Sequence, residues 1–151
     1  YSYIKPKYNE WKDGNVDVSD TPFFFTPTHT GNATLTYERP LAGDAGTLHF
    51  TANGAYTGEH WINALQTSAV IKQHPAEVRH LLKQEEYWMV NISAGWRNIK
   101  NSGVDVLAWV KNLTKEEYKT GGVQLYTGAL GFISASYGDP RTYGLQLRYS
   151  F

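Results

Sequence analysis

The sequence predicts an all-β fold, and more narrowly an antiparallel transmembrane β-barrel. Long stretches alternate between apolar and polar residues, the connections between them are alternately long and short, and tyrosine and glycine are abundant whereas methionine occurs once. Successive strand side chains point to opposite faces, so this alternation predicts strands that separate an apolar medium from a polar one. Lipid on one face and water on the other satisfy that pattern.

Composition supports a folded chain and excludes several classes of function. Of the 151 residues, 41% are apolar and 15% aromatic, which is typical of a folded protein. The 14 basic and 14 acidic residues cancel, so we expect no nucleic-acid partner. The absence of cysteine excludes a disulfide framework and a thiolate metal site. A polar mean hydropathy agrees with a barrel, because only alternate strand residues meet lipid.

The last strand shows the alternation most clearly. Six strand-like stretches are predicted at 1–8, 29–41, 47–60, 85–98, 104–114 and 142–151. The membrane-facing side of the final stretch consists of Tyr143, Leu145, Leu147, Tyr149 and Phe151. In stretches 85–98 and 104–114 the predicted apolar faces are Trp88, Val90, Ile92, Ala94 and Trp96, and Val104, Val106, Ala108 and Val110. The opposite faces of the sheet carry a polar wall that includes Glu38, His49, Arg97, Asp105, Lys111 and Arg148.

The connections give the strands a direction. Segments 9–28, 61–84 and 115–139 are long, whereas 42–46 and 99–103 are short. Transmembrane barrels have short periplasmic turns and longer extracellular loops. We therefore expect the three long segments to lie outside the cell.

Six strands are fewer than a membrane barrel needs. The stretches are about 8 to 14 residues long, which meets the roughly 9 to 11 residues needed to cross a bilayer. About eight strands, however, are the minimum for closure of a membrane barrel. We expect the chain to be the C-terminal part of a longer polypeptide; assembly of one barrel from several copies is the alternative.

Two stretches carry a family resemblance. Residues 104–118 resemble the penultimate strand of TonB-dependent outer-membrane receptors, including the Asn-Leu-x-x-x-x-Tyr element that begins at Asn112. Residues 137–151 resemble the closing strand of those receptors, with Pro-Arg-x-Tyr-Gly from Pro140 and a final Phe151. A glycine-containing loop separates the two stretches, as in the family. The resemblance covers the last third of the chain and is fairly specific when both elements are taken together.

The resemblance implies a 22-stranded barrel with an N-terminal plug domain in the outer membrane of a Gram-negative bacterium. Such a receptor imports a scarce ligand; a ferric siderophore or another iron complex is the first expectation, with haem, cobalamin or a glycan as alternatives. Residues 1–151 would form the C-terminal part of the barrel domain, with the plug and the earlier strands absent. The implied partners are the lipid bilayer, the rest of the same barrel, the small-molecule ligand and the TonB energy-transducing complex, reached through the plug.

Candidate ligand-binding residues are found in two kinds of place. Arg97 and Lys111 belong to the predicted lumen face, where cations would favour an anionic iron chelate. The alternative is an ordinary solvated barrel interior of mixed charge. In the loops, an apolar patch that can mark a contact site contains Phe23, Phe24 and Phe25, and we add His60 and Trp61 at the start of the next long connection.

No pattern indicates a metal, a cofactor or catalysis. The five histidines are His29, His49, His60, His74 and His80, and the last two lack the i, i+4 spacing of a helical ligand pair. Residues 75–83 are predicted to form a short loop helix that starts at a proline. No Gly-x-Ser-x-Gly elbow occurs, so we predict that the protein is not an enzyme. The competing hypotheses are an outer-membrane barrel enzyme and a soluble lipocalin-like carrier, whose eight strands are not visible.

Overall fold

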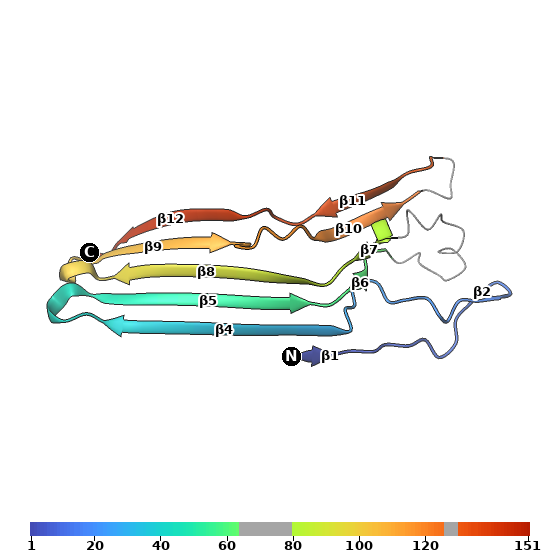
Figure 1. Cartoon of the computed structure of the whole chain (residues 1–151), viewed down its shortest axis with the longest axis horizontal. Coiled ribbons are helices and arrows are strands. Elements are labelled where there is room, and N and C mark those ends of the chain that lie inside the picture. The colour runs from blue at the N-terminus through green and yellow to red at the C-terminus, as the bar shows by residue number, and fades with distance from the viewer. Residues whose placement is uncertain (64–79, 126–129) are drawn as a thin grey trace. The chain divides into compact units, whose positions relative to one another are not determined.

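A computed structural model describes residues 1–63, 80–125 and 130–151 (Figure 1). Its main feature is a six-stranded sheet in which neighbouring strands run in opposite directions, in the order β1-β4-β5-β8-β9-β12. These strands are β1 (Ser2–Tyr3), β4 (His29–Pro40), β5 (Thr47–Thr57), β8 (Tyr87–Arg97), β9 (Val104–Lys111) and β12 (Thr142–Tyr149). The all-β antiparallel fold is therefore confirmed.

Three two-stranded sheets accompany it in the described residues. They pair β2 (Lys12–Asp13) with β3 (Val16–Asp17), β6 (His60–Trp61) with β7 (Lys83–Gln84), and β10 (Lys119–Gln124) with β11 (Ile133–Tyr137). Short 3-10 turns are η1 (Gly43–Ala45), η2 (His80–Leu82) and η3 (Ile99–Asn101). None of the helical turns in the described residues has the length and apolar character of a membrane span.

Contacts divide the chain into two compact units, which we call the sheet unit and the loop unit. The sheet unit comprises 32–55, 88–116 and 139–151. The loop unit comprises 1–31, 56–87 and 117–138.

The strand register of the sheet unit confirms the predicted faces of β8, β9 and β12. Residues paired across antiparallel strands share a face. On one face the pairing gives the rows Tyr143–Val110–Ile92, Leu145–Ala108–Ala94 and Leu147–Val106–Trp96. On the other it gives Thr142–Lys111, Gly144–Trp109–Ser93, Gln146–Leu107–Gly95 and Arg148–Asp105.

No described part of the chain covers the apolar face. Leu145 is 68% exposed and Leu147 is 70% exposed, and the buried hydrophobic residues in the described part, Val18, Ile62 and Leu82, all belong to the loop unit. A soluble sandwich or carrier buries its apolar strand faces inside the protein. An extended apolar face that protein leaves open instead fits an apolar solvent, and in a barrel that solvent is lipid.

The short turns use residues that tolerate a left-handed backbone. In the turn after β8, Asn98, Lys100 and Asn101 have φ values of 48°, 49° and 57°, and Gly103 has φ 72°. The Asn98 Oδ1 accepts the Gly103 N–H at 3.2 Å. A Cβ on Gly103 would collide with the Ser150 carbonyl oxygen, so both the conformation and the space require glycine.

The predicted strands and loops differ from the structure mainly at their ends. The stretch predicted over 1–8 is reduced to Ser2–Tyr3, because Pro6 has no N–H to donate to a ladder. The stretches predicted to end at residues 60 and 114 end instead at Thr57 and Lys111. The loop helix predicted over 75–83 lies mostly outside the described residues. At its end, Lys83 belongs to strand β7 and pairs with β6, where helix was expected.

Candidate functional site

The nominated residues fall into two places, one in each unit. In the loop unit, Phe23, His60 and Trp61 line one pocket, and Phe24 and Phe25 adjoin it. We call this the loop pocket. Arg97 lines a separate hollow on the polar face of the sheet unit, which we call the lumenal hollow.

The loop pocket is built by a strand pair and an extended segment beside it. Across the pair β6–β7, His60 lies opposite Gln84 and Trp61 lies opposite Lys83. Phe24 forms a parallel bridge with Trp61, and the Phe25 N–H donates to the Trp61 carbonyl at 2.8 Å. The pocket has a volume of about 230 Å³, and its walls are Lys5, Pro6, Pro22, Phe23, Thr26, Thr28, Glu59, His60, Trp61 and Lys83.

The lining of the loop pocket combines aromatic faces with basic groups. His60 is only 8% exposed, and its Nδ1 lies 2.9 Å from the Gly58 carbonyl, an acceptor that requires a proton on that nitrogen. The Lys83 ammonium pairs with the Glu59 carboxylate at 2.6 Å. Lys5 adds a second ammonium, for which the described residues offer no carboxylate within ion-pair distance. Such a lining suits an anionic ligand that carries rings.

A buried glutamine anchors the strand that carries the pocket. Gln84 is 5% exposed, and its Oε1 accepts the Lys119 backbone N–H at 2.6 Å. The Lys119 ammonium donates to the Lys83 carbonyl at 2.7 Å, and burial lowers the pKa of Lys119 below the ordinary lysine value. The β10–β11 hairpin therefore docks on β7. Sequence reasoning missed Gln84 and Lys119, because a polar residue inside a predicted loop gives no sign of burial.

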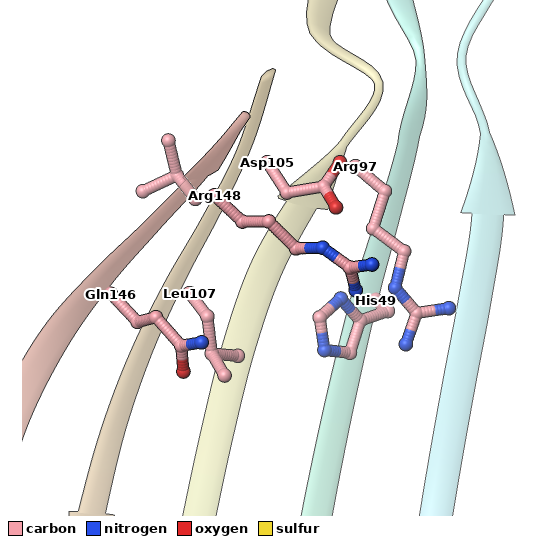
Figure 2. A pocket seen from close by; sticks show the side chains of 7 residues that line it. His49, Arg97, Asp105, Leu107, Gln146 and Arg148 are labelled. Atoms are coloured by element: carbon pink, nitrogen blue, oxygen red, sulfur yellow. The ribbon is translucent and has the colours of Figure 1, made fainter. Parts of the chain in front are cut away.

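The lumenal hollow is lined by side chains of β5, β8, β9 and β12, which are neighbours in the sheet (Figure 2). It has a volume of about 160 Å³ and is lined chiefly by His49, Arg97, Asp105, Leu107, Gln146 and Arg148. The Arg97 Nη1 lies 3.0 Å from the Glu38 carboxylate. The Asp105 Oδ1 accepts the Asn98 N–H at 2.8 Å. The alternation had placed these charged residues on the polar face, but only Arg97 among them was nominated for ligand binding.

Lys111 does not line the same hollow as Arg97. Its ammonium lies 5.6 Å from the centre of the Trp109 ring, and its pairing partner is Thr142 at the start of β12. It lines neither the loop pocket nor the lumenal hollow. The Trp109 ring in turn lies over Gly144, where a Cβ would approach Trp109 Cζ2 to 2.6 Å. A ligand-binding role for Lys111 stays a prediction.

The described histidines were also compared with the arrangement that a metal site requires. Within the described residues, no group of three or more His, Asp or Glu side chains is arranged to hold a metal ion. His74 lies outside the described residues.

The uncovered apolar face, the polar opposite face and the elaborated connections at one end define the class of protein as an outer-membrane β-barrel. Comparison with protein families is more specific. The profile described as "TonB dependent receptor-like, beta-barrel" matches residues 1–113. The chain therefore belongs to the TonB-dependent receptor β-barrel family, and its location is the outer membrane of Gram-negative bacteria.

Two solved structures share the fold. The ferric yersiniabactin uptake receptor FyuA from Yersinia pestis aligns with a TM-score of 0.63 and 20% identity over 86% of this chain. FpvA from P. aeruginosa, solved with heterologous pyoverdine and iron, aligns with a TM-score of 0.56 and 22% identity over 83% of this chain. The chain spans 17% and 14% of the length of these receptors. The comparison with curated proteins gives no match. The family model and the FyuA structure are both described as receptors.

Proposed function

We propose that this chain is part of a TonB-dependent transporter that imports a ferric siderophore. Residues 1–151 then supply the C-terminal wall of a larger barrel and three extracellular loops. A plug domain elsewhere in the receptor couples the barrel to TonB. Family membership supports the transporter class, and the two structures of similar fold bind or take up iron complexes of yersiniabactin and pyoverdine.

The observation that carries the ligand assignment is the loop pocket. Phe23 and Trp61 offer ring faces around a volume of about 230 Å³. Lys5 and Lys83 supply two ammonium groups against the single carboxylate of Glu59 in the lining. Aromatic faces stack on the rings of an iron chelate, and the ammonium groups neutralise its negative charge. Phe24 and Phe25, which are about half exposed, extend the apolar surface beside the pocket. Arg97 and Lys111 remain candidates for contacts along the lumen.

Replacement of Trp61 tests this proposal. Trp61→Ala in the complete receptor is expected to weaken binding of radioactive ferric siderophore to whole cells by about tenfold or more, since aromatic anchors in desolvated pockets dominate binding energy. Trp88→Ala is the matched control, because Trp88 is exposed on the membrane-facing side of the sheet. Equal surface levels of both variants must be shown by heat-modifiable gel mobility.

Deletion of TonB separates binding from transport. Cells without TonB are expected to bind the ferric siderophore normally but to lose its accumulation. Equal binding of the ferric siderophore by Trp61→Ala and Trp88→Ala would show that the loop pocket does not bind this ligand. Accumulation that survives TonB deletion would contradict the transporter class.

A further inference from the structure

The lumenal hollow contains more hydrogen-bond donors than the wall around it satisfies. Arg97 and Arg148 carry permanent positive charge. One arm of Arg97 is held by Glu38. Arg148 is the register partner of Asp105, yet no carboxylate in the described residues lies within ion-pair distance of its guanidinium. Figure 2 shows the Arg148 and Arg97 side chains reaching toward His49 from opposite sides.

His49 contributes a further donor. Its ring lies on Gly95, where a Cβ would approach Nδ1 to 2.7 Å, and Nδ1 is buried without a hydrogen-bond partner in the described residues. A buried N–H without an acceptor is more costly than a bare acceptor nitrogen. A neutral ring with a bare Nδ1 carries its proton on Nε2, which can donate.

Among the described residues Asp105 is the carboxylate that lines the hollow, and it balances at most one of the two guanidinium charges. The Asp105 Oδ1 accepts the backbone N–H of Asn98, so this residue already fixes the turn after β8. The remaining walls are Leu107, which is apolar, and Gln146, whose amide both donates and accepts.

We infer that the lumenal hollow binds a carboxylate, held by Arg148 and by His49, beside the Arg97 guanidinium that Glu38 already pairs. The planar guanidinium matches the two oxygens of a carboxylate and can donate to both. A volume of about 160 Å³ admits a carboxylate with a short stem but not a whole siderophore. The carboxylate is either an acidic side chain of a protein segment inside the barrel or a free organic anion in the lumen.

Carbodiimide cross-linking tests the protein source. In the complete receptor, Arg148→Lys keeps the charge and provides an amine that carbodiimide joins to a touching carboxylate. We expect mass spectrometry to find the amine introduced at this position joined to an acidic residue of a segment inside the barrel, not to a residue of the barrel wall. The matched control is Thr142→Lys, on the same strand and the same face but outside the hollow, and it should give no such product.

Arginine modification tests the free-anion source. Phenylglyoxal reacts with guanidinium groups that are not engaged, and acetate serves as the probe. Acetate at about ten times its dissociation constant should slow modification of Arg148 about tenfold, because only the empty site reacts. Arg141, exposed just before the same strand, is the internal control and should not respond.

The outcomes are distinct. A cross-link to a residue of a segment inside the barrel assigns the carboxylate to that segment, and protection by acetate without such a cross-link assigns it to a free anion. A cross-link to Asp105 alone, together with no protection by acetate, would show that Asp105 already pairs with the side chain at position 148. This result would overturn the inference. Both results are independent of Trp61, so they do not depend on the proposed ligand of the loop pocket.

Discussion

Asn112 links the two ends of the long connection between β9 and β12 by hydrogen bonds. It is 3% exposed, and its backbone N–H donates to the Asn91 Oδ1 at 3.0 Å. Its Nδ2 donates to the carbonyls of Glu116 at 2.8 Å and Asp139 at 3.2 Å, and its Oδ1 accepts the Glu116 N–H at 2.7 Å. The backbone has φ 51°, which asparagine tolerates better than most residues. Side chain and conformation together end β9 here.

We predict that Asn112→Ala loosens the segment 115–139. The change leaves three backbone groups without their partner. It also places alanine in a left-handed conformation that asparagine tolerates better, and together these effects cost about 1–3 kcal/mol in local stability. In outer-membrane vesicles, trypsin should cut after Lys115 or Lys119 faster than in the unchanged protein.

Asn112→Gly separates the two causes, because it removes the side chain without backbone strain. If the hydrogen bonds dominate, Asn112→Gly is cut nearly as fast as Asn112→Ala. Cleavage of Asn112→Gly at the unchanged rate would show that the side-chain bonds hold nothing.

Individual contacts of Asn112 and Tyr118 explain why the Asn-Leu-x-x-x-x-Tyr element has these residues at its two ends. Asn112 supplies the bonds just described. Tyr118, at its other end, stacks on Tyr87 with ring centres 5.1 Å apart and lies over Gly138, where a Cβ would collide with the Tyr118 ring. The sequence identified the element by resemblance, but its partners Asn91, Asp139 and Tyr87 are distant in the chain and were not foreseen.

At the scale of elements, the strand faces were predictable and the loop elements were not. The side-chain period of a strand is two residues, so a local pattern is enough to sort Leu145 from Gln146. The pairs β6–β7 and β10–β11 join segments whose partners are set by packing, and no local pattern specifies them. For the same reason the helix predicted over 75–83 fails at Lys83, where pairing with Trp61 prevails.

A charge introduced at adjacent residues of β12 should destabilise the protein to very different extents. Leu145 lies near the middle of the strand on the uncovered apolar face, and Gln146 lies on the polar face. We predict that Leu145→Arg lowers the free energy of unfolding in lipid vesicles by about 2–4 kcal/mol, because its guanidinium would enter the bilayer. Gln146→Arg should change the free energy of unfolding far less.

The measurement is equilibrium unfolding of the complete receptor from lipid vesicles, followed by tryptophan fluorescence. Each variant carries the same new charge one residue apart, so propensity and net charge are matched. A penalty of similar size in both variants would mean that the apolar face does not meet lipid.

At the scale of the molecule, the chain combines two units that are stabilised in different ways. The loop unit contains the buried residues Val18, Ile62 and Leu82, whereas the sheet unit exposes its apolar face. Water can surround the first but not the apolar face of the second. This contrast places the long connections in water and the strands in the membrane.

Surface labelling tests which side of the membrane the long connections occupy. The sequence has no cysteine, so a single introduced thiol reports its own position within it. We predict that a membrane-impermeant maleimide labels Glu117→Cys in intact cells and labels Asp44→Cys only after the outer membrane is permeabilised. Both positions are exposed, and Asp44 lies in the short turn η1. The reverse labelling would invert the proposed orientation.

The sequence by itself determined the all-β class, the apolar and polar faces of the strands and the family resemblance. These features follow from the alternation of neighbouring residues and from the lengths of the connections, which can be seen without the fold. Only the tertiary structure decided that Phe23, His60 and Trp61 line one pocket while Lys111 lies elsewhere. It also decided that His49, Arg97 and Arg148 surround one hollow. Such groupings depend on strand register and on long-range hydrogen bonds, and they arise from contacts between residues far apart in the chain.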